Sequence, residues 1–123
     1  MSRYIILLPE GEARWAAASP EEKAAGYERH GKFAALLAER GHTITGGAEL
    51  THSRETRTVR RSGDGFLVTE GPYAEATEHV TGFYSVETDD LDDLLECCKV
   101  LADLEQTVEV RPVVEHGDPK EEL

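Results

Sequence analysis

Several features that would identify particular classes of protein are missing from this 123-residue chain. There are only two cysteines, Cys97 and Cys98, and they are adjacent. Neighbouring side chains on a helix point about 100° apart, so we expect no disulfide, with Cys98 in the core and Cys97 nearer the surface. No apolar run approaches the roughly 20 residues of a membrane span. Without a disulfide framework or a secretory leader, the chain is predicted to be cytoplasmic, with no membrane partner.

Positive charge is also scarce: 13 Lys and Arg stand against 25 Asp and Glu, which gives a formal net charge of -12. The only basic cluster in the sequence contains Arg54, Arg57, Arg60 and Arg61. Alternation along a strand would divide these arginines between two faces, whereas phosphate binding needs them together. We therefore expect no direct contact with nucleic acid.

Motifs for metals, nucleotides and covalent catalysis are absent as well. The five histidines show no His-x-x-x-His spacing, so a metal site would need convergence of residues that are distant in sequence. The chain has no phosphate-cradling glycine loop and no serine nucleophile elbow. The sequence therefore predicts neither a metal nor another cofactor.

The apolar residues that are present follow the periods of strands and helices. Arg3 to Leu8 is apolar on both faces, as in a strand that is covered on both sides. Ser19-Pro20-Glu21-Glu22 forms a capping box that predicts a helix ending at Gly41. A second amphipathic helix begins at Thr88 or Asp89. Further strands are expected at residues 42–48, 56–61, 65–69, 79–87 and 107–113, the second and third of these joined as a hairpin.

This order of elements predicts a single α+β domain over residues 1–114, followed by a polar tail at 115–123. Two helices of similar length on one sheet are typical of a ferredoxin-like fold, here with an inserted β-hairpin. The two helices can cover only one face of that sheet. Because the first strand is apolar on both faces, we expect a homodimer in which two sheets pack face to face.

Several segments, in the same order along the chain, carry a resemblance to a known family: Tyr4 to Leu8 with Trp15, Ser19-Pro20-Glu21-Glu22, Glu70-Gly71-Pro72-Tyr73-Ala74-Glu75, Gly82-Phe83-Tyr84 with Glu87, and Val108-Glu109-Val110-Arg111-Pro112-Val113. In these segments the chain resembles the DGPF branch of the YCII-related proteins. The resemblance implies a small ferredoxin-like domain that dimerises in the manner of dimeric α/β barrels. It also implies an undefined enzymatic activity that is attributed to a shared His and Asp. Some members accompany alternative sigma factors, which implies a partner in transcription initiation.

The resemblance places the shared histidine at His30 and the shared acid at Glu70, where the family motif has Asp. His30 falls on the stripe of the first helix that faces the sheet. A carboxylate beside it would orient the imidazole for general acid or base catalysis. The alternative is a core histidine whose ring bonds only a backbone carbonyl.

The residues around Glu70 have two interpretations each. Gly71 and Pro72 form a turn or let backbone amides approach a ligand. Tyr73 stands where the motif has Phe, and it either offers a hydroxyl to a ligand or covers the sheet edge. Glu75 is a second acid in a cleft or a solvated surface residue.

Two aromatic side chains farther away complete the candidate substrate contacts. His79 is expected at the exposed start of a strand, and Trp15 in a loop that packs on the domain or caps a cleft. Three hypotheses follow. The chain is a small cofactor-independent enzyme for proton transfer, elimination or isomerisation on a small organic molecule, a regulatory or ligand-sensing module, or a structural dimer.

Overall fold

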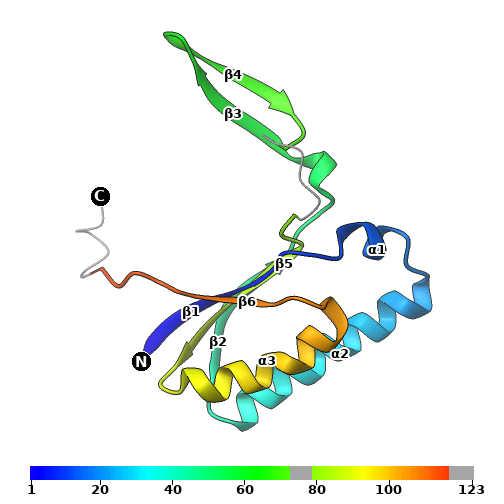
Figure 1. Ribbon diagram of the computed structural model, residues 1–123, viewed down its shortest axis with the longest axis vertical. Coiled ribbons are helices and arrows are strands. Elements are labelled where there is room, and N and C mark those ends of the chain that lie inside the picture. Colours follow the sequence, from blue (N-terminus) through cyan, green and yellow to red (C-terminus); the bar gives the residue numbers. More distant parts are fainter. Residues whose placement is uncertain (73–78, 117–123) are drawn as a thin grey trace.

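The computed structural model describes residues 1–72 and 79–116 of the chain (Figure 1). The described elements follow the predicted order of strands and helices, with two short helices added. They are β1 (Ser2–Leu8), α1 (Glu12–Ala16), α2 (Pro20–Glu39), β2 (Thr43–Glu49), a 3-10 turn η1 (Ser53–Glu55), β3 (Arg57–Ser62), β4 (Gly65–Glu70), β5 (Gly82–Thr88), α3 (Leu91–Glu105) and β6 (Glu109–Pro112).

Four strands form one antiparallel sheet in the order β2-β5-β1-β6. The central strand β1 pairs with β5 from Ser2–Thr88 to Leu8–Gly82, and its other edge pairs with β6. This order, with α2 and α3 as the two crossover helices, is the ferredoxin-like arrangement that the sequence predicts. Strands β3 and β4 form a separate two-stranded sheet, the inserted hairpin.

Local sequence explains the long helix α2. The Ser19 hydroxyl accepts a hydrogen bond from the backbone N–H of Glu22 at 3.1 Å, and the Ser19 N–H donates to the Glu22 carboxylate at 3.0 Å. The predicted capping box is therefore present, with Pro20 in the first turn. Beyond the helix Gly41 has a φ of +84°, a left-handed conformation that glycine adopts without steric cost.

One hydrophobic core fills the space between the sheet and the helices α2 and α3. Its largest fully buried side chains are those of Phe33, Ile6, Leu37, Leu94 and Leu101. Cys97 and Cys98 both lie in this core, so the prediction that Cys97 lies nearer the surface is wrong. The helix α3 turns both of these positions toward buried surroundings.

No helix among residues 1–72 and 79–116 covers the other face of the sheet. Ile6 and Leu8 point into the core, so the alternating positions Ile5 and Leu7 lie on the opposite face. Phe83 is the register partner of Leu7 and shares that face. All three side chains are only half-buried. We call this apolar strip of Ile5, Leu7 and Phe83 the open face.

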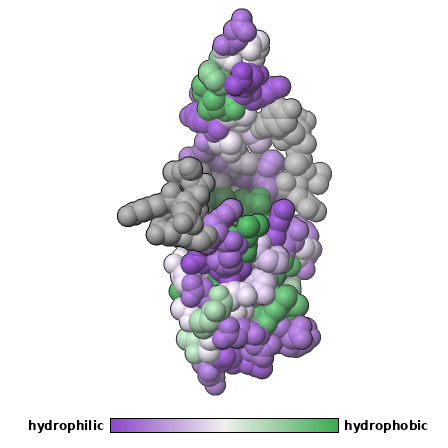
Figure 2. Space-filling model, turned by 90° about the vertical axis from the view of Figure 1, so that its left-hand side faces the viewer, coloured by the Kyte–Doolittle hydropathy of each residue, from purple (hydrophilic) through white to green (hydrophobic). Residues whose placement is uncertain are grey.

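The hairpin β3–β4, with its flanking turns, stands away from the rest of the domain. Figure 1 shows α2 and α3 on one side of the four-stranded sheet and the hairpin projecting on the other side. Every residue of β4 is exposed. We call residues 56–71 the arm. Apolar atoms are visible on it in the space-filling view (Figure 2).

Two positions differ from the sequence-based expectations. Trp15 lies in the helix α1 and not in a loop. His79 precedes β5, which begins only at Gly82, and its side chain is half-buried and not exposed. None of the described helices is long and apolar enough to span a membrane.

Candidate functional site

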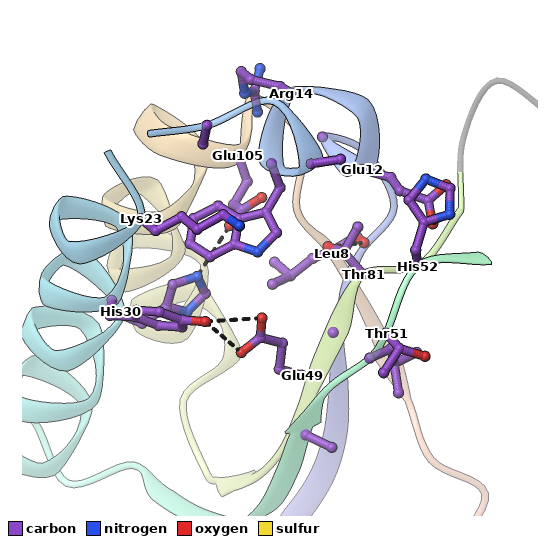
Figure 3. A pocket seen from close by; sticks show the side chains of 18 of the residues that line it. Leu8, Glu12, Arg14, Lys23, His30, Glu49, Thr51, His52, Thr81 and Glu105 are labelled. Atoms are coloured by element: carbon purple, nitrogen blue, oxygen red, sulfur yellow. Dashed lines mark hydrogen bonds and ion pairs between the residues drawn. The ribbon is translucent and has the colours of Figure 1, made fainter. Parts of the chain in front are cut away.

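A cavity of about 660 Å³ lies between α1, α2 and the adjoining ends of the sheet strands. Small-molecule sites in proteins typically have volumes of this order. Figure 3 shows His30 and Glu49 on one side of the cavity and Glu12 with His52 on the other. The other wall residues include Leu8, Arg14, Trp15, Lys23, Tyr27, Arg54, Phe83, Tyr84 and Glu105.

His30 is held by two side chains from other elements. Its Nδ1 lies 2.6 Å from the hydroxyl of Tyr84 on β5, and its Nε2 lies 3.1 Å from Oε1 of Glu105, the last residue of α3. The His30 and Tyr84 rings are stacked at 27°, with centroids 5.9 Å apart. All three residues are half-buried. The helix α2 therefore presents the imidazole at a fixed angle in the cavity wall.

The two hydrogen-bond partners of His30 determine which of its ring nitrogens carries the proton. We call His30, Tyr84 and Glu105 the trio. An ionised carboxylate only accepts hydrogen bonds, so the Nε2–H of His30 donates to Glu105. In the neutral ring Nδ1 then accepts from the Tyr84 hydroxyl. Burial, followed by the charge of Glu105, raises the pKa of Tyr84, which keeps this residue a neutral hydroxyl. One proton can thus move between Tyr84 and Nδ1 while Glu105 balances the charge.

The predicted pair of His30 and Glu70 is not formed. Both ring nitrogens of His30 have other partners, and the carboxylate that orients the ring is Glu105. Glu70 ends the strand β4 with a side chain that is 85% exposed, and its nearest cation is Arg57 at 3.9 Å. The physical reason is that Glu70 belongs to the arm, which points away from the helix layer (Figure 1).

The segment after Glu70 closes the base of the arm. The Gly71 N–H donates to the carbonyl of Thr56 at 2.7 Å, and the Gly71 carbonyl accepts from the Thr58 hydroxyl at 2.8 Å. Gly71 has a φ of +88°, as the turn interpretation requires. Pro72 follows it and is half-buried. Tyr73 and Glu75 lie outside the described residues.

Trp15 both packs on the domain and lines the cavity. Its ring meets that of Tyr27 edge to face, with centroids 5.3 Å apart. It also covers Gly26 of α2, where an added Cβ would lie 2.8 Å from Cζ3 of Trp15. The helix thus uses a glycine where the indole ring needs space. A contact between Trp15 and a ligand stays a prediction.

Comparison with protein-family models matches the chain to the YCII-related domain over residues 2–116. The chain belongs to the YCII-related family. A comparison with curated proteins finds no match.

In this YCII-related protein, several cavity residues escaped the sequence-based prediction. Tyr84 was named only within the segment Gly82-Phe83-Tyr84 of the family resemblance, and nothing marked its hydroxyl as a partner of His30. Glu105 gave no signal among 25 acidic residues. Tyr27 was not selected either, although its hydroxyl bonds both carboxylate oxygens of Glu49, at 3.1 and 3.2 Å.

A second polar group in the cavity wall surrounds Glu12. Its carboxylate accepts hydrogen bonds from the N–H and the hydroxyl of Ser53, and Nδ1 of His52 lies 3.7 Å away. Burial favours the neutral acid, but the Ser53 hydrogen bonds and the fields of His52 and His79 outweigh it and lower the pKa of Glu12. Glu12 thus stays ionised and ties α1 to η1.

Among residues 1–72 and 79–116, one group has donor atoms spaced for a metal ion: His42, Asp93 and Cys97, within 4.8 Å of one another. The sequence predicts no metal. Asp93 already accepts from Nε2 of His42 at 2.7 Å and pairs with Arg40, whose positive charge opposes a cation. The His42 hydrogen bond, together with the Arg40 and His42 charges, lowers the pKa of Asp93 against the effect of burial. The group links the end of α2 to the start of α3.

Proposed function

We propose that this YCII-related protein binds a small organic molecule in the cavity and transfers a proton to or from it without a cofactor. One observation supports this function above the others: His30 sits in the cavity wall with a hydroxyl on one ring nitrogen and a carboxylate on the other. A core histidine that only satisfies its own polarity would not need a cavity beside it.

In this proposal each member of the trio has a separate task. Glu105 holds the Nε2–H tautomer and stabilises the imidazolium when it forms. The Tyr84 hydroxyl accepts a proton from the ligand while its own proton moves to Nδ1 of His30, so that no phenolate accumulates. In the reverse direction the same hydroxyl donates to the ligand. Such a relay serves proton abstraction, elimination or isomerisation.

The rest of the wall limits the class of ligand. Leu8, Trp15 and Phe83 offer apolar and aromatic surface. Polar groups of both charges complete the wall, among them Glu12, the Tyr27–Glu49 pair and the cations Arg14, Lys23 and Arg54. This combination favours a small molecule with an apolar part and at least one polar group that hydrogen-bonds to the wall.

We further propose that two copies pack through the open face. Support comes from the apolar strip of Ile5, Leu7 and Phe83, which no helix covers within the described part of the chain. A twofold axis would place the same strip on both partners. Each cavity then lies beside the interface, because Phe83 of the open face also lines the cavity.

The function is tested by screening a library of small organic acids, amines and carbonyl compounds by NMR against the wild type. Binding should shift the Trp15 indole and the His30 ring signals. Any ligand found is then followed for chemical change with His30→Gln, Tyr84→Phe and Glu105→Gln. We expect each substitution to reduce turnover by about 100-fold or more, as loss of a general acid–base group does.

Glu70→Gln is the matched control, because it removes an exposed carboxylate that does not contact His30. It should leave both binding and turnover unchanged. A ligand that binds at the cavity and is never altered would instead favour the ligand-sensing alternative. Loss of turnover in Glu70→Gln would contradict the assignment of Glu105 as the carboxylate partner.

A further inference from the structure

The arm exposes three large apolar side chains on one of its faces. Val59, Phe66 and Val68 are 67%, 71% and 64% exposed. The register pairs Val59 with Val68 and Arg61 with Phe66, so all these side chains lie on one face of the arm. Neither strand hydrogen-bonds to the four-stranded sheet among the described residues. An isolated two-stranded hairpin is marginally stable at best, and exposed apolar patches mark interaction sites.

We infer that this face of the arm, which we call the Val59–Phe66–Val68 face, packs against the body of a second copy of the same chain. The inference rests on the sheet-to-sheet dimer proposed above. It adds to that dimer a contact between each arm and the body of the partner, which we call the clasp. Each protomer extends its arm along its partner, and by twofold symmetry receives the partner's arm in return.

The position of the arm is the first argument that a second copy of the chain covers its apolar face. Figure 1 places the arm on the side of the sheet opposite α2 and α3, which is the side of the open face. A body that covers Ile5, Leu7 and Phe83 must therefore lie beside the projecting arm. A second copy that covers the open face is therefore within reach of the arm.

Charge is the second argument. The arm, residues 56–71, contains three arginines and two acids, a formal charge of +1, while the whole chain has -12, so the remainder carries -13. The arm is thus slightly basic in a strongly acidic molecule. Its apolar face includes Arg57 and Arg61, and the Arg61 guanidinium stacks 5.7 Å from the centre of the Phe66 ring. An acidic body is a complementary surface for this face, and a second copy supplies one.

The clasp is tested with two substitutions at neighbouring positions of β4. Val68→Asp places a charge on the Val59–Phe66–Val68 face, and Leu67→Asp places the same charge on the opposite face, at a side chain that is 47% exposed. Sedimentation equilibrium of the full chain measures the dimer dissociation constant. Because a buried charge without a partner is costly, we expect Val68→Asp to raise that constant by about 10-fold or more and Leu67→Asp by less than about threefold.

A second measurement locates the arm directly. The photo-crosslinker p-benzoylphenylalanine replaces Phe66, and a mixture of isotopically light and heavy chains is irradiated. Peptides that join a light and a heavy chain, with the attachment on the partner's body, support the clasp. Crosslinks only within one chain overturn it.

The test also separates the clasp from the dimer on which it rests. Ser85→Arg adds bulk and charge to the sheet position opposite Ile5 on the open face. If Ser85→Arg dissociates the dimer and Val68→Asp does not, the sheet-to-sheet dimer stands and the clasp is wrong. A wild type that stays monomeric at concentrations of about 100 μM overturns both proposals; 100 μM corresponds to an association too weak for a standard interface.

Discussion

Gly26 lies directly beneath the indole ring of Trp15, and the space between them is too small for a side chain. A Cβ at Gly26 would approach Cζ3 of Trp15 to 2.8 Å. The cavity wall formed by Trp15 therefore depends on a residue in the middle of α2 that disfavours the helix by about 1 kcal/mol relative to alanine.

Two glycines in the same helix give a matched comparison. Gly26→Ala should displace the Trp15 ring, shift the tryptophan fluorescence and weaken binding in the cavity. Gly31→Ala has open space around the new methyl group and should stabilise the fold by up to about 1 kcal/mol with no change in fluorescence. Urea unfolding and emission spectra measure both effects. Equal stabilisation by the two substitutions would show that Trp15 does not pack on Gly26.

Tyr84 should titrate above the ordinary tyrosine pKa of 10.0, since burial and the Glu105 charge both favour its neutral form. Glu105→Gln removes the smaller of these two causes, so the Tyr84 pKa should fall part of the way and remain raised. The difference between the tyrosinate absorbance titrations of the parent protein and of its Tyr84→Phe variant isolates this residue. No change on removal of the Glu105 carboxylate would indicate that its charge does not reach Tyr84.

The lowered pKa of Asp93 makes the fold sensitive to acid. Its contribution to the free energy of unfolding is fully present above the ordinary value of 3.8 and is lost as the pH falls through the lower value of the folded state. Asp93→Asn should therefore lower stability near pH 7 and flatten the loss of stability below pH 3.8. Urea unfolding at several pH values checks this. The exposed acid Asp89 provides the control, Asp89→Asn, which should leave the acid profile nearly unchanged.

The two cysteines should be unreactive in the folded protein. Burial and the neighbouring Cys97 raise the pKa of Cys98 to about 11, and burial followed by the Asp93 charge raises that of Cys97. Because the thiolate is the nucleophile, alkylation with iodoacetamide at pH 8 should be slow in buffer and fast in denaturant. Mass spectrometry counts the modified thiols. Rapid labelling of one cysteine in buffer would identify a local opening of α3.

Local signals in the sequence were sufficient for much of the fold. The capping residues Ser19 and Glu22, the stop at Gly41 and the alternation along β1 each act over a few residues, so they can be read without the tertiary structure. The helix α1 was missed because its five residues carry too little periodicity to distinguish it from a loop.

The candidate site was only half predictable, and the reason is distance along the chain. His30 was selected from the family resemblance, and its helical stripe, a local property, gave its direction toward the sheet. Its partners Tyr84 and Glu105 lie 54 and 75 residues farther on, and only the packing of β5 and α3 brings them to it. Glu70 was chosen from a motif, but the direction of the arm is set by tertiary structure and takes that residue elsewhere.

The position of β1 in the sheet has a consequence for synthesis on the ribosome. This strand leaves the ribosome before its partners β5 and β6, which begin at Gly82 and Glu109, 80 and 107 positions after Ser2. Contacts of such high sequence separation slow folding, because the intervening chain must lose its freedom before they form. Both edges of this apolar strand stay unpaired until β5 has left the exit tunnel, and one edge stays unpaired until β6 follows. Nascent chains of this protein should therefore be clients of chaperones that bind exposed hydrophobic segments.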